Sequence, residues 1–308
     1  MNLLVTGAWK EAKEYLSEIE KMGHDVKFLQ YEKDLLPCEY DWVEGVICNG
    51  LFLYHPIEKF SRLKYIQLTS AGYDRVPMEY IKKRAIKINN AKDVYSVPMA
   101  EWAVMSVLEI YKNAYVFFEK QKKKTWEKDF SLLELTEKKV CIVGYGSVGR
   151  ETAKRFSAFG AEIIAVNRSK IEDQVVNRWI PLKKIDEILP EVDIIILCIA
   201  LTGETMNLIN SVRLDKMKDG SVLVNISRGN IIERKALRKF LKKEKFRGVA
   251  LDVFDEEPLS KDSDLWETPK VLISPHNSYV GDKVNVRIRE VIYSNLKRVE
   301  VQHKGNNS

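Results

Sequence analysis

Three side chains that could bind an anion or move a proton each follow a short apolar, β-branched run in the second half of the chain. They are Arg228, Glu257 and His276, and His276 is one of only four histidines. A guanidinium can hold a carboxylate through charge-assisted hydrogen bonds, and an imidazole beside a carboxylate can exchange a proton near neutral pH. Each residue alone is a weak signal, because arginines and acidic residues are common in surface loops. If the apolar runs are parallel strands, their carboxyl ends bring the three side chains to the sheet edge where ligands bind.

A glycine-rich turn near the middle of the chain fits the pattern G-x-G-x-x-G. Its glycines are Gly144, Gly146 and Gly149; an apolar run precedes it, and a helical pattern and a second apolar run follow it. The first glycine allows a tight turn, the second lets the backbone approach a pyrophosphate, and the third lets helix and strand pack closely. Ser147 and Val148 start the helix, whose free N–H groups and dipole favour phosphate. We therefore expect a dinucleotide to bind here.

The residues after the second strand of this βαβ unit distinguish NAD from NADP. An acidic residue about 20 positions beyond the glycines would bind the ribose 2′-hydroxyl of NAD. This chain has Asn167 instead, followed by Arg168, Ser169 and Lys170. Without the carboxylate nothing repels a 2′-phosphate, and the guanidinium, hydroxyl and ammonium groups can bind one. We expect NADP to be favoured, with NAD as the alternative if the loop is merely basic.

The composition is that of an ordinary globular protein of 308 residues, with 45% hydrophobic and 31% charged residues. The net charge of +6 is spread out apart from the run 120–124, which predicts a solvated helix face and no nucleic-acid partner. Four cysteines show no metal-binding spacing, so we expect no metal and a reduced, cytoplasmic setting. The longest apolar run, 194–201, is too short to cross a bilayer and no signal-peptide pattern is present, so no membrane partner is expected.

Two series of short elements must position these residues. Before the glycine turn, the patterns predict strands at 2–6, 26–29, 45–48, 64–68 and 86–88, and a helix at 11–22. From the glycine turn onward, they predict strands at 138–143, 162–166, 193–199, 221–226, 247–252 and 271–274, and a helix at 147–159. Near-continuous apolar strands such as these are typical of a parallel sheet covered on both faces.

Longer helical patterns link the two series and set the expected domain boundaries. A largely apolar pattern predicts one long helix at 97–120, and another helix is expected at 282–301. We expect an α/β protein with a Rossmann-type doubly wound parallel sheet plus a smaller flavodoxin-like α/β domain. Residues 1–95 would form the first part of a substrate-binding domain, 96–280 an NAD(P)-binding Rossmann domain, and 281–308 a C-terminal helix that returns to the substrate-binding domain.

Motifs along nearly the whole chain closely resemble the D-isomer-specific 2-hydroxyacid dehydrogenases. The motifs around the three chemical residues are Asn225–Gly229, Leu251–Leu259 and Ser274–His276. Further similar segments are Ser70–Asp74, Met99–Trp102 and Leu201–Thr205. The resemblance implies an oxidoreductase that transfers hydride between NAD(P)H and a small 2-oxo or D-2-hydroxy acid, and it implies a homodimer.

The resemblance also implies a catalytic role for each of the three residues. Arg228 would hold the 2-oxo acid by its carboxylate and carbonyl oxygens. His276 would protonate the ketone oxygen as hydride arrives, and would take the proton back in the oxidation direction. Glu257 would pair with His276 and fix its tautomer.

Four further residues acquire binding roles through the resemblance. Backbone N–H groups around Ser70, Ala71 and Gly72 would cradle the substrate carboxylate. Asp252 resembles the family residue that contacts the nicotinamide end of the cofactor. The alternative for Asp252 is a strand-terminal acid that caps a neighbouring loop.

The expected substrate is a small 2-oxo acid such as glyoxylate or hydroxypyruvate. A D-3-phosphoglycerate dehydrogenase is the alternative, but the loop 49–54 lacks the arginine that would bind a phosphate, and no regulatory domain is expected. An alternative of another class is a corepressor-like protein that senses a dinucleotide. The set Arg228, Glu257 and His276 favours an enzyme.

Overall fold

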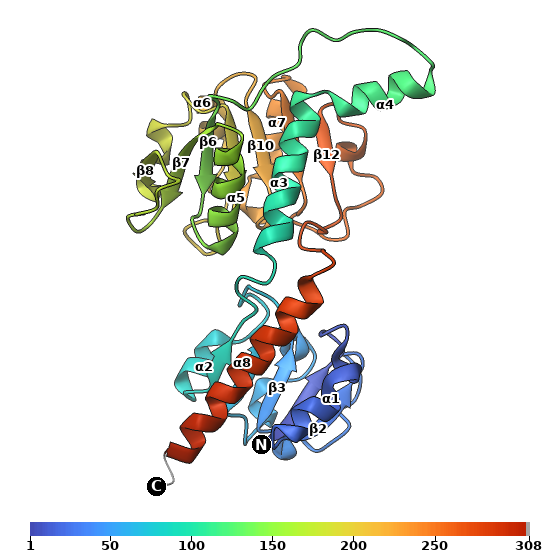
Figure 1. Ribbon diagram of the computed structural model, residues 1–308, viewed down its shortest axis with the longest axis vertical. Helices are drawn as coiled ribbons and strands as arrows, with labels where there is room; N and C mark the ends of the chain where they lie inside the picture. Colours follow the sequence, from blue (N-terminus) through green and yellow to red (C-terminus); the bar gives the residue numbers. More distant parts are fainter. Residues whose placement is uncertain (306–308) are drawn as a thin grey trace. The chain divides into compact units, whose positions relative to one another are not determined.

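The computed structural model describes residues 1–305, and the side chains of residues 1–299. The chain forms two compact units, each with its own parallel sheet (Figure 1). The terminal unit contains Met1–Tyr95 and the residues from Gly281 onward, and the central unit contains Ser96–Val280. Among the described residues, no helix has the length and apolar character needed to cross a membrane.

The terminal unit is built on a five-stranded parallel sheet with the order β2-β1-β3-β4-β5. Its strands are β1 (Asn2–Thr6), β2 (Asp25–Leu29), β3 (Gly45–Cys48), β4 (Tyr65–Leu68) and β5 (Lys87–Asn89). Its helices are α1 (Ala12–Lys21), α2 (Met78–Lys83) and α8 (Val284–Gly305), with the short 3-10 helices η1 (Tyr40–Trp42), η2 (Leu51–Leu53) and η3 (Ile57–Lys59). This is the flavodoxin-like order, in which the chain reverses direction across the sheet between β1 and β3.

Alternate side chains of these strands bury both faces of the terminal sheet. Leu4 and Val46 belong to a cluster with Ile81 of α2, whereas Leu3 and Ile47 pack with α1 and α8 on the other face. Each fully buried aliphatic side chain contributes about 1.5–3 kcal/mol. Helix α8 lies along the sheet beside α1 (Figure 1), so the end of the chain completes a core that its beginning starts.

The central unit is built on a seven-stranded parallel sheet with the order β12-β11-β10-β9-β6-β7-β8. Its strands are β6 (Lys139–Val143), β7 (Glu162–Asn167), β8 (Arg178–Pro181), β9 (Ile194–Leu197), β10 (Val222–Asn225), β11 (Gly248–Leu251) and β12 (Val271–Ile273). Its helices are α3 (Ser96–Tyr111), α4 (Ala114–Lys122), α5 (Ser147–Ala158), α6 (Ser211–Lys216) and α7 (Arg234–Lys242), with the 3-10 helices η4 (Leu182–Glu187), η5 (Gly229–Ile231) and η6 (Asp264–Trp266). The order is that of a Rossmann sheet with one added strand, and it reverses between β6 and β9.

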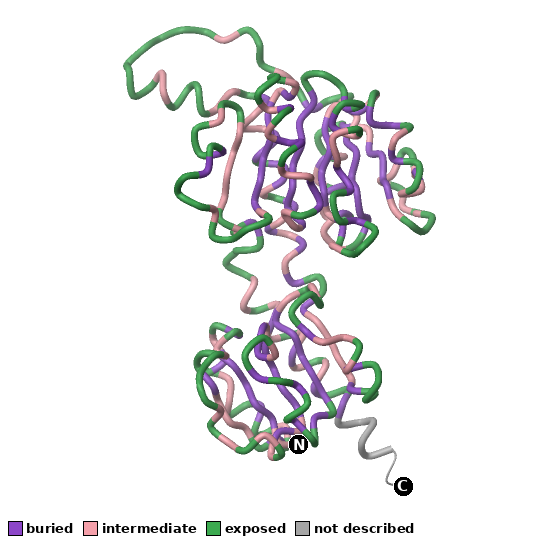
Figure 2. Tube along the Cα trace, turned by 180° about the vertical axis from the view of Figure 1, so that it is seen from behind, coloured by how far each residue is buried: buried purple, intermediate pink, exposed green. Residues whose placement is uncertain are grey.

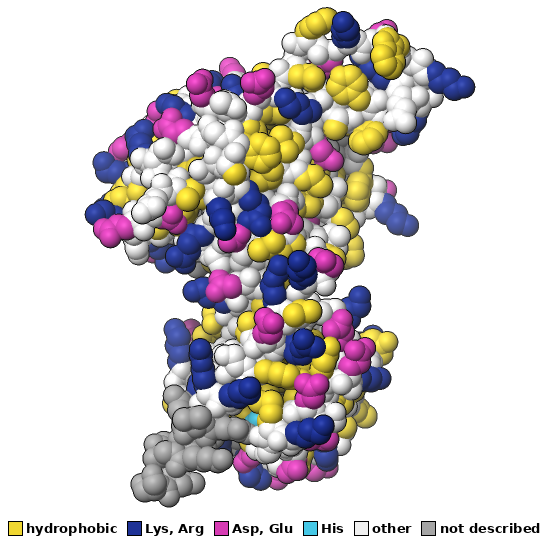
Figure 3. Space-filling model, in the orientation of Figure 1, with side chains coloured by type: hydrophobic (Ala, Val, Ile, Leu, Met, Phe, Trp, Pro, Cys, Tyr) yellow, Lys and Arg dark blue, Asp and Glu magenta, His cyan; other side chains and the backbone are white. Residues whose placement is uncertain are grey.

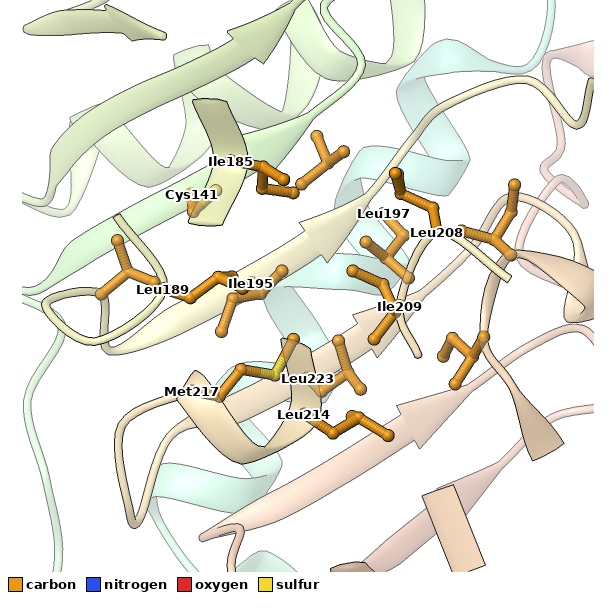
Figure 4. Close-up of a cluster of buried hydrophobic side chains, with 14 of the residues drawn as sticks. Cys141, Ile185, Leu189, Ile195, Leu197, Leu208, Ile209, Leu214, Met217 and Leu223 are labelled. Atoms are coloured by element: carbon orange, nitrogen blue, oxygen red, sulfur yellow. The ribbon is translucent and has the colours of Figure 1, made fainter. Parts of the chain in front are cut away.

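Helices cover both faces of the central sheet, so its strands are apolar along their whole length. Cys141 of β6 and Ile195 of β9 lie in a cluster with Leu214 of α6 (Figure 4), whereas Ile142 packs with Phe156 of α5 on the opposite face. Figure 2 shows the strands as the buried centre of each unit. The two parallel sheets and their strand orders confirm the predicted fold class.

The predicted single helix at 97–120 is wrong. Helix α3 ends at Tyr111, Asn113 adopts a left-handed conformation with a φ of 47°, and α4 starts a new direction at Ala114. Asn113 Nδ2 donates a hydrogen bond to Asp129 Oδ2 (2.7 Å), so a contact from a later loop stabilises the break. Helix α4 and the loop after it, here called the α4 arm (residues 112–132), extend away from the rest of the central unit (Figure 1).

Among the described residues, four α-helices and strands have no counterpart in the prediction, α2, β8, α6 and α7, and the 3-10 helices were not predicted either. Strand β8 lies at the edge of the central sheet and contains the exposed Arg178 and the ring of Pro181. Edge strands tolerate charge and proline because one side of the strand needs no partner, so an apolar run does not reveal them.

Candidate active site

The glycine turn after β6 has two glycines that the fold requires and one that it does not. Gly144 has a φ of 94°, and an ideal Cβ on it would lie 2.7 Å from Ile199 Cα. A Cβ on Gly149 would lie 2.2 Å from Gly144 O, so α5 could not pack against the turn. A Cβ on Gly146 would meet no protein atom within 4 Å. The absence of a side chain at Gly146 therefore leaves space for something outside the protein, at the N-terminus of a helix that favours phosphate.

The residues predicted to read the cofactor ribose lie at the end of β7, beside that turn. Asn167 Oδ1 accepts a weak hydrogen bond from Tyr145 N (3.5 Å), and Asn167 Nδ2 donates to Ser169 O (3.1 Å). Arg168 is exposed, with Nη2 3.5 Å from Thr202 Oγ1 and 3.8 Å from Glu204 Oε2. Lys170 is exposed and pairs with a nearby glutamate (2.9 Å). The segment thus presents two exposed cations next to the glycine turn.

A buried asparagine fixes the turn that carries Arg228. Asn225, the last residue of β10, is fully buried, and its Oδ1 accepts hydrogen bonds from Ser227 N (3.1 Å) and Ser227 Oγ (2.8 Å). Its Nδ2 donates to Arg228 O (3.0 Å). Gly229 lies so close to the loop after β11 that a Cβ on it would be 1.9 Å from the carbonyl carbon of Phe254. The hydrogen bonds of Asn225 explain why an asparagine precedes the arginine in this turn, and the close approach to Phe254 explains why a glycine follows it.

His276 and Glu257 form a hydrogen-bonded pair. His276 Nδ1 lies 2.8 Å from Glu257 Oε2, while Glu257 Oε1 accepts a bond from Phe254 N (3.0 Å). Because an ionised carboxylate only accepts hydrogen bonds, the pair places a proton on Nδ1 and directs Nε2 to an external partner. Both side chains are about one-third exposed, so a substrate can reach them.

Asp252 holds the loop in which His276 lies. It follows β11, is fully buried, and its Oδ1 accepts hydrogen bonds from Asn277 N (2.7 Å), Ser278 N (3.0 Å) and the hydroxyl of Ser274. Asp252 O also accepts a bond from His276 N (2.8 Å), whose backbone has a φ of 50°. The described contacts thus give Asp252 a loop-capping role, and its contact with the cofactor stays a prediction.

The predicted carboxylate loop lies in the terminal unit, directly after β4. Its carbonyl groups are occupied: Ser70 O accepts from Ala91 N (2.9 Å), Ala71 O from Asn90 Nδ2 (2.6 Å) and Gly72 O from Ser70 Oγ (3.1 Å). The carbonyl oxygens of the loop are thus bound within the terminal unit, and its binding of an anion through N–H groups stays a prediction.

The structure brings the three predicted catalytic residues onto neighbouring loops of the central unit. Arg228 follows β10, Glu257 follows β11 and His276 follows β12, and these strands are adjacent and parallel. Their carboxyl ends form one edge, as in other open α/β sheets that bind ligands there. Ser70, Ala71 and Gly72 belong to the other unit.

Three residues with supporting roles were missed by sequence reasoning. Asn225 lies within the motif Asn225–Gly229, but the sequence does not show that its carboxamide binds Ser227 and Arg228. Ser278 lies two residues beyond the motif Ser274–His276, and its N–H binds Asp252, which is 26 residues earlier. Asn90 reaches back 19 residues to Ala71. Ser278 is buried, and its hydroxyl has no hydrogen-bond partner among the described residues.

Desolvation raises the pKa of all four cysteine thiols, and the described residues contain no group of metal-ligating side chains that could hold an ion. Cys48 and Cys141 are buried and Cys198 is half-buried, and desolvation raises the pKa of all three thiols; that of Cys198 rises to about 12. Their thiols therefore stay protonated and unreactive near neutral pH.

The NAD-binding domain of the D-isomer specific 2-hydroxyacid dehydrogenases matches residues 104–278, which is more than half of the chain. The chain belongs to this family. It is 31% identical over 255 residues to a glyoxylate reductase of Pyrococcus furiosus, covering 79% of this dehydrogenase and 76% of the relative. It is also 31% identical over 245 residues to a D-3-phosphoglycerate dehydrogenase of Methanocaldococcus jannaschii, of which it spans only 47%.

A solved structure extends the similarity to both units. The D-lactate dehydrogenase of Aquifex aeolicus, complexed with NAD and lactic acid, has a TM-score of 0.82 and 27% identity, covering 99% of this dehydrogenase and 96% of that chain. Together these similarities make the protein an oxidoreductase with a nicotinamide dinucleotide cofactor. The residues around the glycine turn fit such a group, because Gly146 is free of protein neighbours and α5 starts there.

Proposed function

We propose that this dehydrogenase reduces small 2-oxo acids such as glyoxylate or hydroxypyruvate to 2-hydroxy acids, in the D configuration where the product is chiral, with NADPH as the favoured cofactor. The observation that carries the proposal is the hydrogen bond of 2.8 Å between His276 and Glu257. The loop of Glu257 lies between the loops of His276 and Arg228, because β11 pairs with both β12 and β10. An oriented acid–base pair and a guanidinium at the same edge of the sheet are what the reduction of an anionic ketone requires.

The roles follow from the donors and acceptors of each side chain. The nicotinamide, when bound, supplies the hydride that reaches the carbonyl carbon. Arg228 binds the carboxylate and carbonyl oxygens of the substrate, which polarises the carbonyl. His276 gives a proton from Nε2 to the carbonyl oxygen, and Glu257 keeps the other proton on Nδ1. Hydride and proton together convert the ketone to the alcohol.

The test of the catalytic roles is the substitution His276→Asn. Loss of the acid–base group lowers kcat on glyoxylate and hydroxypyruvate by about 100-fold or more, since general acid–base catalysis contributes 10²–10⁴-fold. The Kd of NADPH, followed by fluorescence, stays within about twofold because His276 lies on a different loop from the glycine turn. Near-normal turnover by this variant on several 2-oxo acids would contradict the acid–base role of His276.

The proposed preference for NADPH rests on Asn167 in place of an acid and on the exposed guanidinium of Arg168. Arg168→Ala should weaken NADPH binding about tenfold or more while leaving NADH binding within about twofold, because only NADPH carries the 2′-phosphate. Lys170→Ala is the matched control for a general loss of positive charge, since Lys170 is also exposed and pairs with a glutamate. Equal losses for both cofactors would contradict the 2′-phosphate argument.

A phosphorylated substrate is the second candidate, and one observation favours it. The loop 49–54 has no arginine, but a Cβ on Gly50 would lie 3.8 Å from Arg75 Cδ, so an exposed guanidinium belongs to this region after all. Steady-state kinetics with 3-phosphohydroxypyruvate and hydroxypyruvate separate the two. A kcat/KM higher for the phosphorylated acid, and reduced in Arg75→Ala for that acid alone, would replace the leading substrate.

We also propose that the dehydrogenase is a homodimer formed through the central unit. Helices α3 and α5 border an apolar groove of about 650 Å³, lined by residues that include Met105 and Phe159. The α4 arm adds Tyr115, Trp126 and Phe130, which are 74%, 99% and 91% exposed. In Figure 3 hydrophobic side chains gather over this face and along the arm. An exposed apolar surface of this extent is typical of a protein interface.

A further inference from the structure

The carboxylate of Glu32 binds two backbone amides of the segment that follows β3. Its Oε1 accepts hydrogen bonds from Asn49 N (2.7 Å) and Thr6 Oγ1 (2.8 Å), and its Oε2 accepts one from Gly50 N (2.7 Å). Hydrogen bonds to an ionised acceptor at these distances are roughly twice as strong as neutral ones. Both carboxylate oxygens are therefore used to hold one short stretch of backbone.

Glu32 lies where the terminal sheet reverses direction. Thr6 ends β1 and Asn49 follows β3, and these neighbouring strands lead the chain to opposite sides of the sheet. In open α/β sheets the crevice at such a point commonly binds a ligand. Here the carboxylate of Glu32 accepts hydrogen bonds from N–H and O–H groups that could otherwise bind an anionic ligand. Glu32 therefore holds the protein's own backbone at this point.

A buried histidine fixes the same segment at its other end. His55 is 5% exposed, and its Nε2 lies 3.0 Å from Glu32 O and 3.1 Å from Asp34 O. Carbonyl oxygens only accept, so Nε2 carries the proton and Nδ1 accepts from the hydroxyl of Tyr40 (2.9 Å). Residues 49–55, here called the anchored segment, are thus tied to residues 32–34 at both ends.

The anchored segment leaves the sheet beside the loop that follows β4. Strands β3 and β4 are adjacent, and Thr69 N donates a hydrogen bond to Cys48 O (2.8 Å). The next residues are Asn49 on one side and the carboxylate loop Ser70–Gly72 on the other. We propose that Glu32 is a positioning residue that fixes the anchored segment beside this loop and thereby sets the affinity for the 2-oxo acid. The inference rests on the substrate-binding role proposed for Ser70–Gly72.

Replacement by glutamine reveals what the carboxylate contributes, because the size of the side chain hardly changes. An amide has one oxygen and one NH2 group, so either Asn49 N or Gly50 N would face a donor instead of an acceptor. A backbone amide left without its acceptor destabilises the local conformation. The anchored segment would then open more often while the rest of the sheet stays intact.

The experiment compares Glu32→Gln with Glu44→Gln in the intact enzyme. Glu44 is the matched control, because its Oε2 also accepts a backbone N–H, that of Asn2 (3.1 Å), but at the amino end of the same sheet. In Glu32→Gln we expect faster hydrogen exchange at Asn49 and Gly50 and a KM for glyoxylate about tenfold higher. We expect kcat to fall by less than about threefold and the Kd of NADPH to stay unchanged, because the catalytic loops and the glycine turn are elsewhere.

The outcomes separate positioning from general stability. Glu44→Gln should lower Tm without moving KM, and a rise in KM of equal size in both variants would reduce Glu32 to a structural residue. If Glu32→Gln does not fold, Thr6→Val removes a single donor to the same carboxylate and should raise KM less, in the same direction. Unchanged exchange at Asn49 and Gly50 would overturn the anchor itself. If the wild-type enzyme is inactive on 2-oxo acids, the proposed function is wrong. Hydrogen exchange at Asn49 and Gly50 then still shows whether Glu32 holds the anchored segment.

Discussion

The conformation of His276 depends on contacts with Asp252 and Glu257, which both follow the neighbouring strand β11. Its left-handed backbone is strained for a non-glycine residue, by about 1–3 kcal/mol in general. Glu257 orients its ring, and the buried Asp252 ties down the residues on both sides of it. The position of the proton-transfer atom is therefore a property of three residues, and each of them can be tested separately.

Asp252→Asn should lower kcat about 100-fold, because the loop around His276 loses an acceptor and the imidazole shifts by a fraction of an ångström. If Asp252 acts only as a loop cap, the Kd of NADPH remains within about twofold. If it also contacts the nicotinamide end of the cofactor, that Kd rises with the loss of kcat. Measuring both constants in one variant thus decides between the two roles considered for this residue.

Two glycines of the glycine turn should respond to alanine in opposite ways, one in cofactor binding and the other in stability. Gly146→Ala should keep the wild-type Tm and weaken NADPH binding about tenfold, because its Cβ meets no protein atom within 4 Å. Gly149→Ala should lower Tm by about 4 °C or more, because its Cβ would lie 2.2 Å from Gly144 O. Thermal unfolding without cofactor and NADPH titration check both. A lower Tm in Gly146→Ala would show that the protein, and not its ligand, requires that glycine.

Among the elements, those with strong periodicity could be predicted and those fixed by distant contacts could not. The apolar runs of β6 and β9 identify buried strands, because both faces of the sheet are covered. The break after α3 has no glycine or proline to signal it. Asn113 takes its left-handed conformation with the help of Asp129, which lies 16 residues further on. Only the folded chain brings these two residues together.

The junction of β6, β9 and β10 should weaken in acid. Burial raises the pKa of Asp193, but hydrogen bonds from Lys218 Nζ (2.7 Å) and Lys139 N (2.9 Å) outweigh it, so the net pKa lies below its ordinary value of 3.8. A lowered folded-state pKa stabilises above the unfolded value, and that contribution is lost as pH falls through the folded value. Asp193→Asn should therefore have a lower Tm than wild type at pH 7, with a difference that shrinks below pH 3.8.

Thermal unfolding across this pH range checks the prediction, with Asp219→Asn as the control. Asp219 also pairs with a lysine, but its side chain is 90% exposed, so solvent screens the pair and its removal should hardly change Tm. A Tm difference for Asp193→Asn that does not depend on pH would mean that packing, and not charge, links these strands.

For the whole molecule, the order of motifs along the chain revealed the fold better than it revealed the site. Strand ends place Arg228, Glu257 and His276 on adjacent loops, which could be predicted without knowing any contact. The hydrogen bonds of Asn225 and Glu32 could not. Those of Asn225 depend on how its side chain turns back onto Ser227 and Arg228, and those of Glu32 join it to residues 17 to 26 positions away. Their carboxamide and carboxylate look in the sequence like any other polar residue in a loop.

The proposed homodimer is tested most directly at the α4 arm. Helix α3 and the α4 arm expose apolar side chains that a dimer interface would bury. Trp126 and Phe130 are almost fully exposed and do not pack in the core of the unit. Trp126→Glu with Phe130→Glu should convert a dimer to a monomer in analytical ultracentrifugation, because burying two unpaired carboxylates in an apolar interface is highly unfavourable. The exposed Tyr31 and Leu35 of the terminal unit provide the control pair, since Tyr31→Glu with Leu35→Glu adds the same charge away from this face. A wild-type protein that sediments as a monomer at micromolar concentration would rule out the dimer. A dimer that survives the arm substitutions but not the control pair would show that its interface lies elsewhere.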